Sequence, residues 1–153
     1  MIAERQPHVT PQTVYTASPG ETFELGERIG RELSGGEVIM LTGGLGAGKT
    51  LLTKGILNAL DFDVDEVTSP SFALVNLYRA KFDVYHIDLW RVDERADAAA
   101  AVGLNDLLDN EDAIFVIEWA EKLRSIDLGP KLLQIAIKGD GDDPREIIID
   151  PII

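Results

Sequence analysis

Residues 43–50 read GGLGAGKT and directly follow the apolar segment EVIMLT, residues 37–42. They satisfy the pattern G-x-x-x-x-G-K-[ST], in which a glycine-rich loop joins a strand to a helix. Glycine permits the left-handed backbone that turns successive N–H groups toward an anion, and the start of the following helix favours negative charge. The stretch therefore predicts a phosphate-binding loop (P-loop), rather than only a flexible turn with a solvated lysine.

Two side chains of this loop have specific expected roles. Lys49 supplies a positive charge for the β- and γ-phosphates of a nucleotide, and Thr50 supplies a hydroxyl ligand for Mg²⁺. The whole loop is expected to line the nucleotide, through Gly43, Gly44, Leu45, Gly46, Ala47, Gly48, Lys49, Thr50 and Leu51.

The segments on either side of the loop predict helices. Residues 18–33, SPGETFELGERIGREL, predict a helix with Ser18 as its cap, Pro19 at its first position and Glu21 completing a capping box. Residues 51–60 have apolar side chains at helical spacing. Gly55 interrupts this helix at a cost of about 1 kcal/mol relative to alanine, which we attribute to close packing.

The rest of the chain alternates between predicted strands and a helix. A tight hairpin is expected from FALVNLYR and FDVYHIDL, a buried central strand from AIFVIEW, and a closing strand pair from KLLQIAIKG and REIIID. These segments are residues 72–79, 82–89, 113–119, 131–139 and 145–150. Residues 94–108 predict a helix that is broken near Gly103.

Two acidic residues are candidates for the metal and catalytic site. Glu118 ends the AIFVIEW strand and Asp88 ends the VYHIDL strand, and the carboxyl ends of strands line the ligand crevice of open α/β sheets. The alternatives are that Glu118 caps a following helix and that Asp88 is a surface acid paired with Arg91. His86 alternates with Asp88 on the same side of its strand and is interpreted as a structural group.

The loop TSPSF, residues 68–72, brings hydroxyl groups close to a stiffening Pro70. Loops of this kind can order around Mg²⁺ and the γ-phosphate and relax after hydrolysis. A simple turn that enters the next strand explains the same residues equally well.

Composition limits the class of protein. The 153 residues carry a net charge of −13, with 14 basic and 27 acidic residues and no cysteine. Because nucleic-acid affinity comes largely from lysine and arginine on phosphates, strong direct binding to nucleic acid or to an anionic membrane is not expected. We expect a flexible tail over residues 1–12, a single domain over residues 13–153 and a cytoplasmic location.

Four motifs in order resemble one family, the bacterial ATPase of tRNA threonylcarbamoyladenosine biosynthesis (TsaE). The motifs are GGLGAGKT, SPSF, HIDLWR and VIEW, and the similarity runs from about residue 22 to residue 145. The resemblance implies a single P-loop NTPase domain of the α/β class, with a mixed central sheet of about seven strands flanked by helices. It also implies Mg-ATP as the substrate.

The same resemblance implies roles for individual residues. Glu118 and Asp88 would be the metal-site and catalytic acids, together with Thr50 as a metal ligand, and the order of importance of the two acids stays open. Ser71 would be a switch hydroxyl, and Trp119 would lie near the nucleotide. Thr22 and Arg145 would approach the nucleoside.

Two departures from the family pattern are Ser71, where threonine is usual, and Ala120, where proline is common. Neither change is expected to abolish binding of ATP or magnesium. The family implies TsaD and TsaB as partners, which would contact tRNA in place of this acidic chain. The alternatives are a small-molecule kinase, although no arginine-rich lid is evident, and a non-catalytic nucleotide-dependent adaptor.

Overall fold

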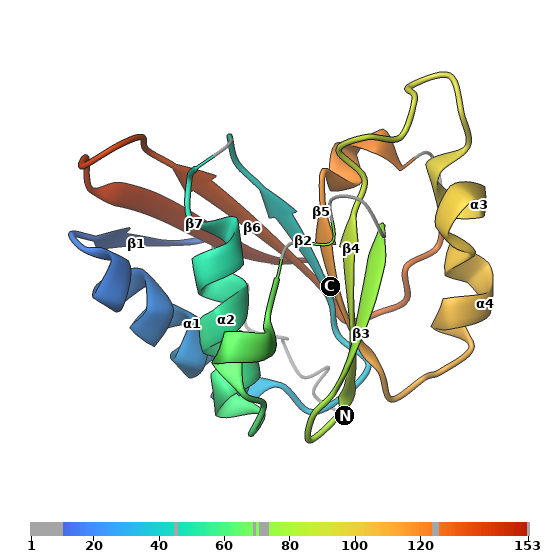
Figure 1. The fold of residues 1–153 in the computed structure, drawn as a ribbon, viewed down its shortest axis with the longest axis horizontal. Coiled ribbons are helices and arrows are strands. Elements are labelled where there is room, and N and C mark those ends of the chain that lie inside the picture. The colour runs from blue at the N-terminus through green and yellow to red at the C-terminus, as the bar shows by residue number, and fades with distance from the viewer. Residues whose placement is uncertain (1–10, 45, 69, 71–73, 124–125, 153) are drawn as a thin grey trace, which may run out of the picture.

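The computed structural model describes residues 11–44, 46–68, 70, 74–123 and 126–152. Within these residues one mixed sheet has the strand order β1-β7-β6-β2-β5-β4-β3 (Figure 1). The strands are β1 (Gln12–Thr16), β2 (Val38–Thr42), β3 (Val75–Arg79), β4 (Asp83–Asp88), β5 (Ile114–Glu118), β6 (Leu132–Lys138) and β7 (Arg145–Ile152).

The centre of the sheet is parallel and its margins are antiparallel. β2 pairs in parallel with both β5 and β6, and β4 pairs in parallel with β5. β3, β7 and β1 each add in the antiparallel sense. The carboxyl ends of β2, β4 and β5 therefore meet at one end of the sheet, at the top of Figure 1, where such folds bind ligands.

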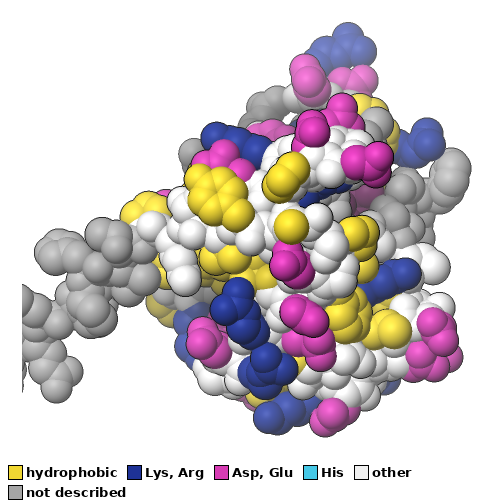
Figure 2. Space-filling model, turned by 90° about the vertical axis from the view of Figure 1, so that its left-hand side faces the viewer, with side chains coloured by type: hydrophobic (Ala, Val, Ile, Leu, Met, Phe, Trp, Pro, Cys, Tyr) yellow, Lys and Arg dark blue, Asp and Glu magenta, His cyan; other side chains and the backbone are white. Residues whose placement is uncertain are grey.

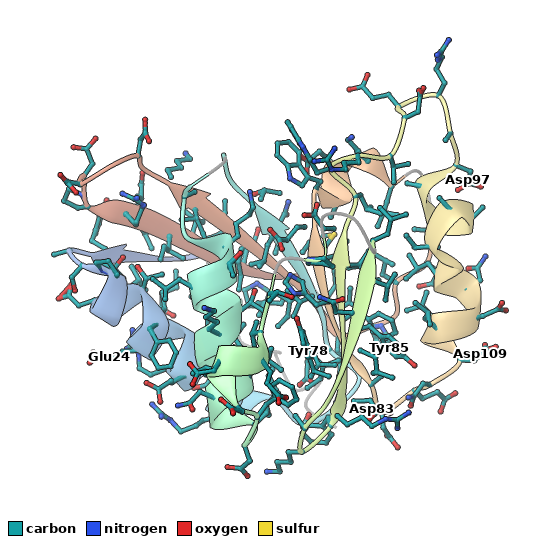
Figure 3. All side chains as sticks on the ribbon, viewed as in Figure 1. Glu24, Tyr78, Asp83, Tyr85, Asp97 and Asp109 are labelled. Carbon is teal, nitrogen blue, oxygen red and sulfur yellow. The ribbon has the colours of Figure 1, made fainter. Side chains whose placement is uncertain are left out.

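Helices cover both faces of the sheet. α1 (Pro19–Glu32) and α2 (Lys49–Ala59) pack on one face, and the short α3 (Ala98–Val102) and α4 (Leu104–Leu108) lie on the other (Figure 1). Two one-turn 3₁₀ segments, η1 (Val64–Glu66) and η2 (Ala120–Lys122), complete the described elements. Tyr78 and Tyr85 belong to opposite hydrophobic clusters, and Figure 3 shows them on opposite faces of the sheet.

Glycines let α1 and α2 approach each other closely. A Cβ built on Gly55 would lie 2.1 Å from the carbonyl oxygen of Phe23, and one built on Gly26 would lie 2.3 Å from that of Leu52. Any larger residue would push the helices apart, since such distances are far below van der Waals contact. The attribution of Gly55 to close packing is confirmed.

Most of the expected elements are confirmed. The hairpin is β3 and β4, the closing pair is β6 and β7, and all five residues of β5 are buried. Gly103 has a φ of 65° and separates α3 from α4, as its position in the sequence predicts, but the helix expected from residue 94 begins only at Ala98, after its cap Asp97.

Two further details differ from the sequence-based expectation. The Ser18 side chain caps α1 by accepting from the N–H of Glu21, but the Glu21 carboxylate accepts from the N–H of Ala17 instead of closing the box on Ser18. The edge strand β1, which begins at Gln12 and pairs with β7, was not anticipated.

None of the described helices has the length and apolar character that a membrane crossing requires.

Candidate active site

The P-loop connects the end of β2 to the start of α2. Gly48 has a φ of 110° and precedes the first residue of α2, and Gly46 has a φ of 76°. Residues with a Cβ rarely adopt such angles, so the glycines at these two positions are required by the backbone. The loop thus has the backbone form that its sequence predicts, although Leu45 lies outside the described residues.

Lys49 lies inside the loop and is only 7% exposed. Its Nζ donates hydrogen bonds to the carbonyl oxygens of Gly43, at 2.6 Å, and Gly44, at 3.1 Å. The same ammonium group lies 5.1 Å from the centre of the Trp119 ring. The charge expected for phosphate binding is therefore held at the mouth of the loop by two backbone oxygens.

Arg145 braces the loop from the first residue of β7. Its Nε donates to the carbonyl oxygen of Ala47 at 2.9 Å, and a terminal nitrogen donates to that of Gly46 at 3.3 Å. Further bonds reach the carbonyls of Gly141 and Asp143 in the β6–β7 connection. The guanidinium thus ties two segments almost 100 residues apart in sequence, and it lies beside the loop expected to hold the nucleotide.

A cavity of about 500 Å³ opens where the parallel strands end. The P-loop forms one wall, and Asp88 and Glu118 form another. The two carboxyl residues sit directly opposite each other in the β4–β5 register and are 5% and 3% exposed. The structure therefore brings both predicted acids to the loop, as the carboxyl-end rule predicts.

The structure limits the alternative interpretations of these acids. Asp88 is buried and so is not a surface acid, although Arg91 borders the same cavity. The short η2 segment after β5 has Trp119 at its cap position with no side-chain capping bond, so Glu118 does not cap it.

Different neighbours hold the two carboxylates. Oδ1 of Asp88 accepts from the backbone N–H of Trp90 at 2.9 Å, within its own loop. Oε2 of Glu118 lies 2.6 Å from Nε2 of His86 on the adjacent strand, and the His86 side chain is completely buried. The sequence placed His86 on the same side of β4 as Asp88, but its contact with Glu118 depends on a strand register that the sequence alone does not give.

Two tryptophans border the cavity. The rings of Trp90 and Trp119 lie 4.5 Å apart, and Trp119 has a φ of 60°, a left-handed conformation that is unusual for a bulky residue and common at functional sites. Nζ of Lys122 donates to the carbonyl oxygens of Trp90 and Val92, which ties the loops after β4 and β5 together. Trp90, which the sequence suggests as a core or interface residue, is 41% exposed, and Lys122 was not singled out, since loop contacts of this kind leave no pattern in the sequence.

A second cavity of about 320 Å³ lies on the other side of the P-loop. It is bordered by the start of α1 with Thr22, by Gly46–Gly48 and Leu51, and by Arg145 with the preceding loop. Thr22 is buried and its hydroxyl lies 2.7 Å from that of Thr16 on β1. Residues expected near a nucleoside thus share one cavity, and the P-loop separates it from the cavity with the acids.

The expected switch residue Ser71 lies outside the described residues. Thr68, three residues earlier in the chain, is held by the Tyr78 hydroxyl. This hydroxyl donates to the Thr68 carbonyl at 2.9 Å and accepts from the Thr68 N–H at 3.2 Å. The start of the TSPSF loop is therefore anchored to β3.

The side chains at this cavity that could bind a metal ion do so through oxygen atoms. No cluster of three or more histidine, cysteine or acidic side chains suited to a metal ion occurs among the residues that the structure describes. Mg²⁺ in nucleotide sites takes one or two carboxylates together with phosphate oxygens and water. Asp88, Glu118 and the nearby Thr50, which all border the cavity with the acids, fit that requirement.

Comparison with known proteins agrees with this geometry. The family model described as "Threonylcarbamoyl adenosine biosynthesis protein TsaE" matches residues 16–147. A protein of Treponema pallidum named tRNA threonylcarbamoyladenosine biosynthesis protein TsaE is 33% identical over 132 residues, which cover 86% of this chain and 95% of that protein. A Mycobacterium tuberculosis protein of the same name is 39% identical over 110 residues, 67% of this chain.

The aligned part spans 65% of the mycobacterial protein, slightly less than two thirds of its length. The crystal structure of Bacillus subtilis YdiB superposes with a TM-score of 0.71 at 29% identity and covers 94% of this chain and 87% of that one. Fold, P-loop and family model therefore agree, and the chain belongs to the TsaE family of threonylcarbamoyl adenosine biosynthesis proteins.

Proposed function

We propose that this chain binds Mg-ATP across its P-loop and hydrolyses it. The observation that carries the proposal is the pair of buried carboxylates, Asp88 and Glu118, which face the P-loop across one cavity. Two carboxyl groups that line one cavity together with the P-loop lysine suit a site that binds a metal cation and phosphates.

The nucleotide would run from one cavity to the other. Its phosphates would lie on the P-loop backbone, with the γ-phosphate toward the acids, and its nucleoside would enter the cavity bordered by Thr22 and Arg145. Support for this placement comes from the loop residues Gly46–Gly48, which line both cavities.

The proposed roles follow from the contacts of each group. Lys49 would exchange its bonds to the Gly43 and Gly44 carbonyls for phosphate oxygens, and the N–H groups at the start of α2 would add further donors. Glu118 would orient the attacking water, with Asp88 as the second acid at the metal. Trp119 would cover the phosphates, since its ring already lies against the lysine ammonium.

Thr50, Asp88 and Glu118 would hold the metal ion. When bound, Mg²⁺ would supply positive charge that offsets the negative charge developing on the phosphates. Ser71, which follows the anchored Thr68, is proposed as the switch hydroxyl at this site.

The pathway follows from the relatives, whose names assign them to tRNA threonylcarbamoyladenosine biosynthesis. We propose that this chain acts in the same pathway in the cytoplasm, with TsaD and TsaB as partners that contact the tRNA. The net charge of −13 supports this division of labour. On the face shown in Figure 2, acidic and basic side chains are interspersed, without the continuous basic surface that a nucleic acid requires.

The test is steady-state ATP hydrolysis by the pure protein, alone and with TsaB, TsaD and tRNA. We expect slow turnover alone, about 10⁻⁴ to 10⁻² s⁻¹, and faster turnover with the partners, because P-loop proteins that lack a completed site are slow. Binding without hydrolysis under both conditions would favour the adaptor, and phosphate transfer to a small metabolite would favour the kinase.

The variant Lys49→Ala tests whether the P-loop binds ATP. Loss of a charge that contacts the phosphates should weaken ATP binding by at least about tenfold, equivalent to about 1.4 kcal/mol. Unchanged affinity, measured by isothermal titration calorimetry, would contradict the assignment of the loop.

A further inference from the structure

His86 is a buried polar side chain to which the proposed reaction assigns no role. It is completely buried, and its Nδ1 has no hydrogen-bond partner among the described residues. A buried polar atom without a partner costs free energy, so an aliphatic residue would fill this position in the core more favourably. The presence of a histidine at this position is therefore explained by the contact that its other ring nitrogen, Nε2, makes.

That other nitrogen makes one short hydrogen bond, to Glu118. Nε2 lies 2.6 Å from Oε2 of Glu118. An ionised carboxylate only accepts hydrogen bonds, so Nε2 is assigned as the donor. With Nδ1 unpaired and buried, a single N–H on Nε2 leaves no ring donor unsatisfied.

The position of His86 suits it to fix the carboxylate. Asp88 lies opposite Glu118 in the β4–β5 register, and His86 precedes Asp88 by two residues on the same face of β4. The imidazole thus approaches Glu118 from the interior of the sheet, away from the cavity. Its ring packs against Tyr78, with ring centres 6.2 Å apart, and Tyr78 is itself anchored to Thr68.

We propose that His86 is a positioning residue for ATP hydrolysis. Its Nε2–H holds one oxygen of Glu118, so that the carboxylate keeps the orientation in which its other oxygen serves the reaction. His86 does not border the cavity and contacts Glu118 rather than the nucleotide. The inference rests on the proposed function, in which Glu118 orients the attacking water.

Two substitutions separate a positioning role from simple core packing. His86→Leu removes the donor and retains an apolar side chain, whereas His86→Gln keeps an N–H donor near the position of Nε2. We expect kcat to fall by about 10- to 100-fold in His86→Leu, as it does when a residue that orients a metal-binding side chain is removed. In His86→Gln, kcat should recover substantially. The Kd for ATP should change by less than about threefold in both, since the phosphate contacts remain.

Val84→Ala is the matched control for stability. Val84 is also completely buried, lies two residues before His86 on the same face of β4, and makes no hydrogen bond through its side chain. It should lower the melting temperature and leave kcat unchanged. If His86→Leu behaved like Val84→Ala, or if His86→Gln were no more active than His86→Leu, His86 would be a packing residue and the inference would be wrong.

A second readout needs neither nucleotide nor metal. The chain has two histidines, so His8→Ala protein labelled with ¹⁵N-histidine reports His86 alone. We expect an Nε2–H proton shifted far downfield by the short bond to Glu118, and an upfield move of that signal in Glu118→Gln. A signal from a proton on Nδ1, or one that Glu118→Gln does not move, would overturn the inference.

The two proposals fail in different ways. If the unmodified protein hydrolyses no ATP with its partners present, the proposed function fails and the role of His86 fails with it. If the unmodified protein and His86→Leu hydrolyse ATP at the same rate, only the positioning role is wrong.

Discussion

The two cavities beside the P-loop differ in chemistry. The cavity at the strand ends contains ionisable and aromatic side chains, with Asp88 and Glu118 facing Lys49. The cavity beside α1 is bordered by hydroxyl groups, by the P-loop and by the exposed Asp142 and Asp143 of the β6–β7 connection, and its arginine is bonded to carbonyl oxygens. Under the proposed function, the first cavity is the reaction side of the loop and the second is the recognition side, so substitutions should separate turnover from affinity.

The largest expected effect is on the reaction side. Glu118→Gln keeps the shape of the side chain and removes its charge, so we expect kcat to fall by about 10²- to 10⁴-fold while the Kd for ATP stays within about threefold. Asp88→Asn is the comparison variant, measured by the same steady-state assay and calorimetry. A greater loss of kcat in Asp88→Asn would make Asp88 the main catalytic acid.

The next effect is on stability, at the contact between α1 and α2, because the start of α1 borders the cavity on the recognition side. Gly55→Ala places a methyl group against the Phe23 carbonyl, and should destabilise the fold by about 1–3 kcal/mol or more, as overpacking does. Chemical denaturation measures this free energy. Gly20→Ala is the control, because a Cβ there meets nothing closer than Ser18 Oγ at 3.8 Å. Equal stability of the two variants would show that the helices do not depend on this contact.

Arg145→Ala should weaken nucleotide binding without slowing the saturated enzyme. The variant loses the bonds that hold the Gly46 and Ala47 carbonyls, and we expect about tenfold weaker binding, or about 1.4 kcal/mol, by calorimetry. Arg95→Ala, at an exposed residue whose side chain pairs with nearby Asp93, should bind normally. A lower kcat with normal affinity in Arg145→Ala would contradict the division between the two cavities.

The smallest effect is expected at Thr22. Thr22→Val keeps the shape of the side chain and removes its hydrogen bond to Thr16, worth about 1 kcal/mol. Since the hydroxyl pair borders the recognition cavity, we expect affinity to fall by about two- to fivefold and kcat to stay the same. A change in kcat alone would place Thr22 on the reaction side.

Local patterns predicted much of the fold and of the site. The P-loop glycines, the cap at Ser18 and the break at Gly103 each leave a signature within a few residues. Asp88 and Glu118 were found because strand ends can be located from apolar runs, and parallel strands bring their ends together. Such rules need no knowledge of distant contacts.

Contacts between distant segments could not be predicted in this way. The bond from His86 to Glu118 depends on register, and the bonds from Arg145 to the P-loop join residues about 98 positions apart. β1 was missed because its five residues lie at the sheet edge and are mostly exposed, so they lack a clear apolar alternation. These features arise from tertiary packing, which can override local propensity.

The most direct test of the central claim is a crystal structure with Mg²⁺ and a non-hydrolysable ATP analogue. Our account predicts the base in the cavity beside Thr22 and Arg145, the phosphates along Gly46–Lys49, and the γ-phosphate next to Glu118. A base stacked on Trp90 or Trp119, with the phosphates directed away from the acids, would contradict it.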